Sequence, residues 1–213
     1  MNESTFLYIY LAALVAVYLA PGPDMALVMA TSASRGLRAG VYTAVGIGAA
    51  RYIHVLGSGL GLAALFSMYP ASQDIVKFVG AGYLLFLAWK MVTSRKTERD
   101  KNSTPAPMRT DMMLGFFTNL LNPKALLFCS LLLPQFTSPE HGPLFVQFLW
   151  LGGVLVAVGL LFDVIYSFLA SRLTVYFLEI ARKGSSVGIY VDHARRWLMI
   201  VVFICIALKL LMK

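Results

Sequence analysis

The sequence predicts an all-α integral membrane protein with six transmembrane helices. We expect two inverted three-helix repeats, with helices 1 and 4 broken by proline. Of the 213 residues, 59% are hydrophobic and only 13% are charged, which is more apolar side chain than one soluble core can bury. Apolar stretches of bilayer length recur along the chain, and the basic residues gather in alternate loops. Two similar helix-breaking motifs stand at equivalent places in the two halves.

Six stretches reach the length of about 20 apolar residues that a spanning helix needs. They cover roughly residues 5–30, 39–66, 74–93, 112–136, 143–170 and 197–212. Little chain is left over, so we expect a single transmembrane domain over residues 1–213. The first stretch follows MNESTF, which lacks the basic region of a signal peptide, and we expect that stretch to be retained as a span.

The basic residues predict the orientation. Of the 18 Lys and Arg, 12 lie in three loops: Arg35 and Arg38; Arg95, Lys96, Arg99, Lys101 and Arg109; Arg172, Arg182, Lys183, Arg195 and Arg196. The positive-inside rule places these loops in the cytoplasm and both termini in the periplasm. Because this alternation accounts for the net charge of +8, we expect no nucleic-acid partner.

A polar segment separates the two halves. Residues 94–111, SRKTERDKNSTPAPMRTD, mix charges with proline and predict a flexible cytoplasmic linker. Repeat 1 then covers about residues 1–93, and repeat 2 covers about residues 112–213.

A second segment, from Ser171 to Gly184, has helical periodicity. It predicts either an amphipathic helix at the membrane interface or an extension of the fifth span, and its apolar face would contain Leu173, Tyr176, Phe177 and Ile180.

The two halves share a motif. Residues 22–28 read GPDMALV and residues 122–128 read NPKALLF, so each half begins with a helix breaker, a proline, a charge and an apolar run. Because each half contains an odd number of spans, the second half must enter the membrane from the opposite side. Inverted repeats of this kind are common among secondary transporters.

The prolines predict broken helices. A proline lacks the N–H that would bond the carbonyl four residues earlier. In lipid, an unpaired carbonyl costs several kcal/mol unless another group meets it. The carbonyls affected by Pro21, Pro23 and Pro123 are those of Val17, Leu19 and Asn119.

Each motif also predicts the start of a half-helix, at Gly22-Pro23 and at Asn122-Pro123, because proline is favoured at the first helical position. The exposed N–H groups there suit an anion such as a carboxylate.

Five ionisable residues fall inside the predicted spans: Asp24, Arg51, His54, Lys124 and Asp163. A charge at the centre of a spanning helix costs about 2.5–3.5 kcal/mol, so we expect these residues to face the protein interior. The four formal charges cancel, which predicts ion pairing that includes Arg51. Ion pairs that only fix helix packing remain the alternative to a functional site.

Three segments carry a family resemblance: LAPGPDMALVM, GAGYLLFLAWK at residues 80–90 and GFFTNLLNPKALLF at residues 115–128. In this order, and over nearly the whole chain, the sequence resembles the LysE/RhtB family of the lysine exporter superfamily. The resemblance implies a bacterial inner-membrane exporter of amino acids or their derivatives, driven by proton exchange. It implies no enzymatic activity and no cofactor.

The motifs and the resemblance together predict a substrate site. We expect the substrate carboxylate to meet the half-helix starts with Lys124 and Asn119, and the substrate ammonium to meet Asp24 and the carbonyls that the prolines leave unpaired. The substrate-binding candidates are Gly22, Pro23, Asp24, Asn119, Asn122, Pro123 and Lys124. The proton-coupling candidates are Asp24, which is the first choice, His54 and Asp163.

Arg51 would repel cationic substrates, which favours neutral substrates similar to homoserine or threonine.

Other function classes remain open at this point. A metal-cation exporter of the same superfamily would need clustered carboxylate, His or Cys ligands, but the spans offer two Asp and one His, and we predict no metal site. A membrane thiol-disulfide electron carrier would need a cysteine at matching places in both repeats. The chain has Cys129 and Cys205 instead. A homo-oligomer is compatible with the sequence, as are protons and lipid as partners.

Overall fold

The computed structural model describes residues 3–62, 68–69, 71–93, 107–182 and scattered positions between 197 and 212, and this part of the chain is helical. The prediction of an all-α fold is confirmed. Residues 94–106 of the expected linker and most of the expected sixth span lie outside the described residues. The α-helices are α1 (Glu3–Leu19), α2 (Pro23–Arg35), α3 (Leu37–Gly57), α5 (Ala71–Thr93), α6 (Met108–Leu120), α7 (Pro123–Leu127) and α8 (Leu144–Arg182).

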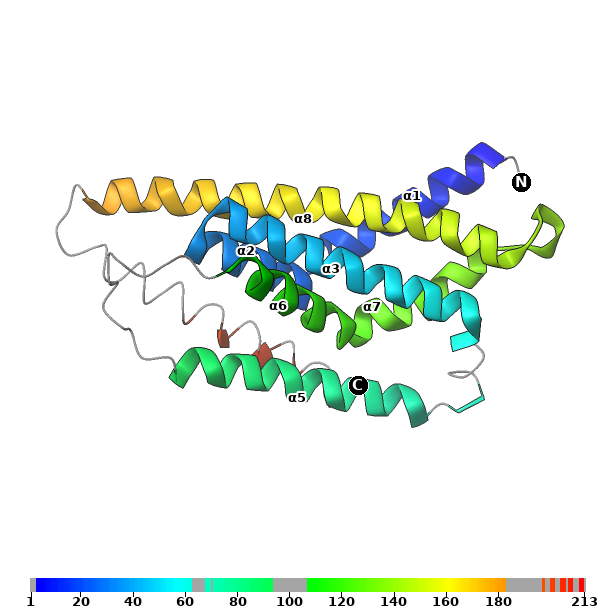
Figure 1. Cartoon of the computed structure of the whole chain (residues 1–213), viewed down its shortest axis with the longest axis horizontal. Coiled ribbons are helices and arrows are strands. Elements are labelled where there is room, and N and C mark those ends of the chain that lie inside the picture. Colours follow the sequence, from blue (N-terminus) through cyan, green and yellow to red (C-terminus); the bar gives the residue numbers. More distant parts are fainter. Residues whose placement is uncertain are drawn as a thin grey trace.

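Short helical turns complete the described elements: η1 (Ser58–Leu62), η2 (Phe128–Leu132), η3 (Leu133–Phe136) and η4 (Pro139–His141). The long helices lie along the long axis of the molecule (Figure 1). The pair α1–α2 runs in one direction along this axis, and the pair α6–α7 runs in the other. The two proline motifs therefore enter the bundle from opposite ends.

Both proline motifs break their helices. The pair Phe6–Leu19 and Pro23–Arg35 is bent by 57°, and so is the pair Met108–Leu120 and Pro123–Phe136. Counted as one span each, these pairs are apolar enough to cross a membrane, and α8 meets the same test alone from Leu144 to Tyr176. Among the described residues, length and composition thus identify up to three candidate spans, where the sequence predicts six.

Helix α3 is not among these candidate spans, and its composition gives the reason. This helix is long enough to span, but Arg51 and His54 lie within it and lower its mean hydropathy. Both side chains are buried, so the polarity of α3 faces the protein. A hydropathy criterion cannot tell such a helix from a polar one.

Helices α3 and α6 are in backbone contact. A Cβ atom added at Gly46 would collide with the carbonyl of Met112, and one added at Gly115 would collide with the carbonyl of Thr43. Small residues allow this close approach between helices in lipid. The contact fixes α6, and with it the second break, against α3.

The fifth predicted span continues without interruption to Arg182 as part of α8. Of the two interpretations of the segment from Ser171, the extension of the span is therefore the one observed. Helix α6 begins at Met108, four residues before the expected span, and Pro107 is its N-cap.

An ion pair joins the two broken pairs at one end of the bundle. Arg35, in the last turn of α2, pairs with the buried carboxylate of Asp111, in the first turn of α6.

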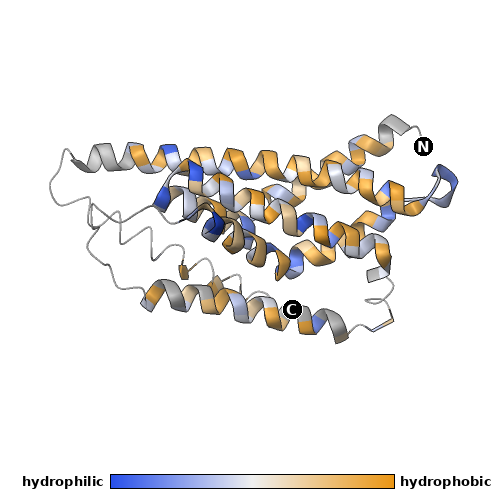
Figure 2. Cartoon of the chain, viewed as in Figure 1, coloured by the Kyte–Doolittle hydropathy of each residue, from blue (hydrophilic) through white to orange (hydrophobic). Residues whose placement is uncertain are grey.

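The hydropathy of the residues differs between the long faces of the bundle and its ends (Figure 2). Hydrophobic residues cover most of α8, and hydrophilic residues gather around η4 and at the α2–α3 junction.

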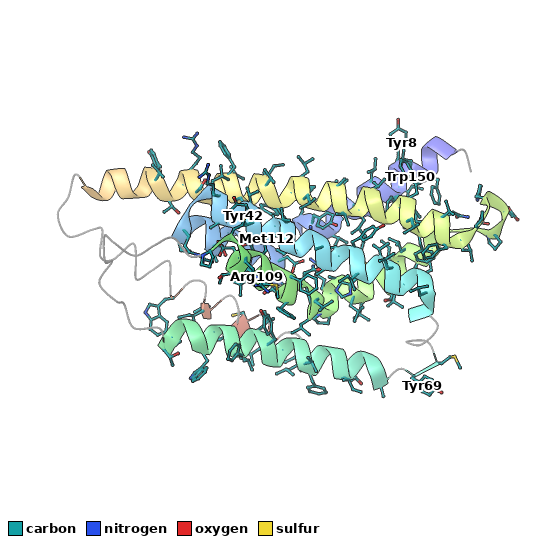
Figure 3. The ribbon with its side chains drawn as sticks, in the orientation of Figure 1. Tyr8, Tyr42, Tyr69, Arg109, Met112 and Trp150 are labelled. Carbon is teal, nitrogen blue, oxygen red and sulfur yellow. The ribbon has the colours of Figure 1, made fainter. Side chains whose placement is uncertain are left out.

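Exposed aromatic side chains lie on the outer faces. Tyr8 on α1 is 71% exposed and Trp150 on α8 is 70% exposed. They lie near the same end of the molecule (Figure 3). Tyrosine and tryptophan are enriched where a membrane protein crosses the headgroup region. This placement fits a bundle whose apolar sides contact lipid.

Candidate functional site

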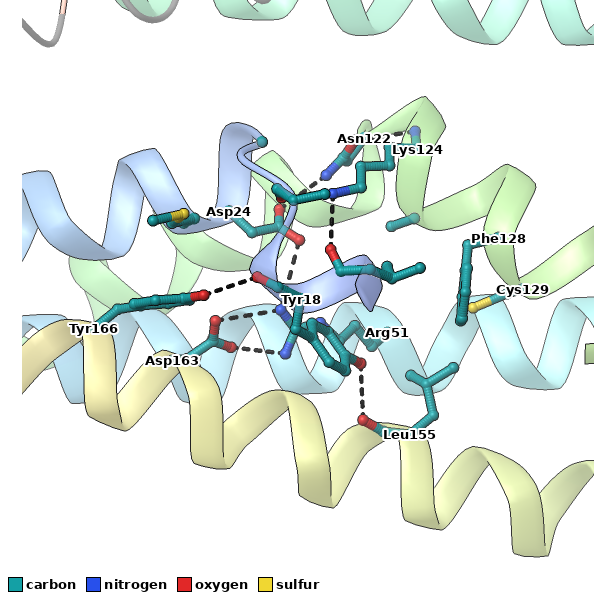
Figure 4. Close-up of a pocket in the computed structure, with 15 residues that line it drawn as sticks. Tyr18, Asp24, Arg51, Asn122, Lys124, Phe128, Cys129, Leu155, Asp163 and Tyr166 are labelled. Atoms are coloured by element: carbon teal, nitrogen blue, oxygen red, sulfur yellow. Dashed lines mark hydrogen bonds and ion pairs between the residues drawn. The ribbon is translucent and has the colours of Figure 1, made fainter. Parts of the chain in front are cut away.

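The two helix breaks lie next to each other and border a cavity. The first break separates α1, which ends at Leu19, from α2, which starts at Pro23 with Gly22 as the N-cap. The second separates α6 from α7, where Asn122 is the N-cap. A cavity of about 50 Å³ lies between them (Figure 4). That volume holds only a few water molecules.

Asp24 is held by two amides from the other break. The side-chain nitrogen of Asn119 donates to one carboxylate oxygen over 2.7 Å, and that of Asn122 donates to the other over 3.1 Å. Asn119 is fully buried. Asn122 also caps α7, because its side-chain oxygen accepts from the backbone N–H of Lys124 over 3.0 Å. One asparagine thus fixes both the start of α7 and the carboxylate of α2.

Arg51 is the central cation of the site (Figure 4). Its Nη1 lies 2.7 Å from Oδ2 of Asp163, and its Nη2 lies 3.3 Å from Oδ1, so the pair has two contacts. The same Nη2 lies 3.6 Å from Oδ2 of Asp24. The guanidinium also stacks over the ring of Tyr18, with 4.9 Å from Cζ to the ring centroid. Arg51 therefore links α3 to α8, to α2 and to the end of α1.

Lys124 lines the cavity and reaches across it to the first break. Its Nζ donates to the carbonyl of Val17 over 3.0 Å and to that of Ala20 over 2.8 Å. The Val17 carbonyl is one of those that Pro21 leaves without a helical partner. The ammonium of Lys124 thus lies at the C-terminal end of α1, which carries the negative end of the helix dipole.

His54 contacts the backbone of Asn119, one of the two asparagines that hold Asp24. Its Nε2 is 3.0 Å from the backbone carbonyl oxygen of Asn119. A carbonyl oxygen can only accept, so Nε2 is the donor of this hydrogen bond. The same carbonyl accepts from the backbone N–H of Asn122 over 2.9 Å. Asn119 therefore connects His54 on one side to Asp24 on the other.

The structure brings most of the predicted site residues to one place. Those that line the cavity are Gly22, Asp24, Arg51, Asn122, Lys124 and Asp163. Those that are not among its lining residues, but lie beside it, are Pro23, Asn119, Pro123 and His54.

Sequence reasoning missed two tyrosines. The hydroxyl of Tyr166 donates to the backbone carbonyl of Tyr18 over 2.9 Å, at the last turn of α1. The hydroxyl of Tyr18 donates to the carbonyl of Leu155 on α8 over 2.8 Å. Both tyrosines line the cavity. A tyrosine in an apolar span, three residues before Pro21, is the signal that could have identified Tyr18.

The comparison with known families agrees with this architecture. The LysE type translocator family matches residues 15–212. The chain belongs to this family. The translocator is 29% identical over 170 residues to the homoserine/homoserine lactone efflux protein of Salmonella typhimurium, which covers 79% of this chain and 82% of that protein. It is 28% identical over 184 residues to the leucine efflux protein of Salmonella choleraesuis, covering 84% and 85% of the two chains.

A further relative is an uncharacterized membrane protein of Pseudomonas aeruginosa, 31% identical over 197 residues, which covers 87% of the translocator and 89% of that protein. No solved structure matches the chain. Family membership makes the chain a membrane efflux translocator with helical spans, and not an enzyme.

Proposed function

We propose that this translocator exports amino acids with uncharged side chains, similar to homoserine or threonine, across the bacterial inner membrane in exchange for protons. The observation that carries the proposal is the charge balance of the cavity. Asp24 and Asp163 contribute two negative charges, and Arg51 and Lys124 contribute two positive ones. A zwitterion adds no net charge to such a site, whereas a cationic side chain would add one that nothing there balances.

The helix ends support the same substrate class. The N-terminal ends of α2 and α7 provide positive potential for a carboxylate, and the C-terminal end of α1 provides negative potential for an ammonium group. Relatives named for efflux of homoserine or leucine have substrates with uncharged side chains. The carboxylates of the site are held by amides and a guanidinium, a set of partners that suits a zwitterion more than a metal ion.

The proposal includes the topology. Six spans would form two inverted three-helix repeats, with both termini in the periplasm and the 94–111 linker in the cytoplasm. The equal bends of the two broken pairs and their opposite directions support this arrangement. Residues 1–93 and 112–213 would then pack as one transmembrane domain around the cavity.

Asp24 is the proposed proton carrier. In its ionised form it accepts from Asn119 and Asn122 and lies within ion-pair distance of Arg51. A proton on this carboxylate would turn one of its oxygens into a hydroxyl, which accepts more weakly than an ionised oxygen, so the hydrogen bond from one amide would weaken. Uptake and release of the proton would thereby loosen and restore the connection between the two breaks. Asp163 and His54 are the further candidates for proton transfer.

The test uses proteoliposomes loaded with a mixture of the common amino acids and L-homoserine. A pH gradient with the outside acidic is imposed, and the compounds that leave are identified by mass spectrometry. We expect neutral amino acids to leave faster with the pH gradient than after an uncoupler has collapsed it. An export rate that is the same with and without the pH gradient, or faster export of lysine and arginine than of neutral amino acids, would contradict the proposal. Protein-free liposomes are the control.

A further inference from the structure

The ammonium of Lys124 occupies a binding site made of backbone carbonyls. We call the carbonyl oxygens of Val17 and Ala20 the α1 carbonyl pair. The Nζ of Lys124 lies 3.0 Å and 2.8 Å from these two oxygens. Proline at position 21 leaves the first of them without a helical N–H. Two accepting oxygens at the negative end of a helix form a site for a cation that can donate hydrogen bonds.

These two hydrogen bonds do not require a lysine. The α1 carbonyl pair accepts from an ammonium head, and the α-ammonium of an amino acid offers the same charge and the same N–H donors. The pair also belongs to the cavity, since Val17 and Ala20 line it together with Asp24. A ligand inside the cavity would therefore reach these oxygens if Lys124 moved away.

Such a movement would enlarge the cavity. Its volume of about 50 Å³ accommodates a few water molecules. Lys124 crosses from the first turn of α7 to the end of α1, and its long flexible stem borders the cavity (Figure 4). Moving this side chain would open space and release a cation at the start of α7, where a substrate carboxylate would lie.

We infer that Lys124 holds the place of the substrate's ammonium group in the empty carrier, and that a ligand must bring a primary ammonium to displace it. The inference rests on the proposed export of amino acids for the identity of the ligand. The exchange conserves charge, because one ammonium replaces another on the α1 carbonyl pair. The displaced Lys124 then neutralises the ligand's carboxylate.

The first experiment replaces the lysine side chain with a free amine. Lys124→Ala removes the side chain beyond Cβ, and n-propylammonium supplies the missing atoms. Without amine, we expect the melting temperature of the variant in detergent to fall by about 2–4 °C, as befits the loss of one hydrogen-bonded partner. Propylammonium chloride should restore most of this loss, whereas tetramethylammonium chloride, which has no N–H, should not. Neither salt should shift the wild type.

Three results would overturn the inference: an equal response of Lys124→Ala to both salts, no response to either, or a wild-type shift as large as that of the variant. If Lys124→Ala cannot be recovered folded, Lys124→Met answers the same question with ammonium chloride. Methionine keeps the stem, and the ammonium ion supplies the head. Tetramethylammonium chloride is again the comparison salt, and the same three results with Lys124→Met would overturn the inference.

The second experiment concerns the ligand. Wild-type proteoliposomes are loaded with L-homoserine and N-acetyl-L-homoserine, which lacks the ammonium. We expect efflux of the first and less than a tenth of that rate for the second. Equal efflux overturns the inference. Efflux of neither compound contradicts the proposed substrate, and the amine rescue, which uses no amino acid and no pH gradient, then decides the inference by itself.

Discussion

Arg51 and Asp163 form a two-contact ion pair between α3 and α8, with 2.7 Å and 3.3 Å between the paired atoms. Both side chains are almost completely buried, with residue exposures of 3% and 2%. Nη2 of the same guanidinium lies 3.6 Å from Oδ2 of Asp24. The pair therefore also positions a cation next to the carboxylate beside the first helix break.

Removing the guanidinium should destabilise the fold. Arg51→Met leaves Asp163 buried without its partner, and we expect a loss of about 3–5 kcal/mol in the free energy of unfolding. The double variant Arg51→Met/Asp163→Asn should recover part of this loss, because no uncompensated charge remains. Thermal and denaturant unfolding in detergent would measure both.

The control for this pair is Arg38→Met, on the same helix but with an exposed side chain. It should change the free energy of unfolding by less than about 0.5 kcal/mol. An Arg51→Met protein as stable as Arg38→Met would contradict the structural role of the pair.

Asn122 should separate helix capping from carboxylate binding. Serine caps a helix about as well as asparagine, but Asn122→Ser lacks the amide that donates to Asp24. We expect a loss of about 1.5–3 kcal/mol, the range for hydrogen bonds to charged groups. Asn122→Asp also caps the helix, but it places a second carboxylate beside Asp24 and should be the less stable variant. The prediction fails if the two variants unfold together with the wild type.

The α3–α6 contact makes a prediction about glycine. Gly115→Ala would place a methyl group against the carbonyl of Thr43, so we expect it to cost about 1–3 kcal/mol. Gly153→Ala on α8 is the matched control, because no atom lies within 4 Å of the added Cβ. It should be neutral or stabilise by about 0.5–1 kcal/mol. Equal melting temperatures for the two variants would refute the close contact.

The breaks could be predicted from the sequence because their cause is local. A proline lacks an N–H wherever it stands, and the residue types at Gly22 and Asn122 are those of helix starts. The pairing of the charged residues followed from the cost of a lone charge in lipid. These arguments need no knowledge of which helices are neighbours.

Other features depend on how the helices pack in the folded protein. Lys124 has a stem long enough to reach either a substrate or the opposite break, and only the observed packing shows it on the carbonyls of Val17 and Ala20. The contact of Tyr166 with the carbonyl of Tyr18 joins residues 148 positions apart. The segment after Ser171 carries no breaker before Gly184, so its periodicity fits both a separate helix and a longer α8.

The central claim is that Asp24, in the cavity between the two breaks, couples proton movement to export. The most direct measurement is efflux of L-homoserine from proteoliposomes with acid outside, for Asp24→Asn, the wild type and Glu140→Gln. Asparagine keeps the size of the side chain but cannot carry the charge, and Glu140 is an exposed carboxylate in η4.

At equal amounts of folded protein, we predict that the gradient-driven efflux rate of Asp24→Asn is at least about 100-fold lower than that of the wild type. A lost interaction worth about 2.7 kcal/mol would produce this difference. Glu140→Gln should export at the wild-type rate. Gradient-driven efflux by Asp24→Asn at the wild-type rate would contradict the account.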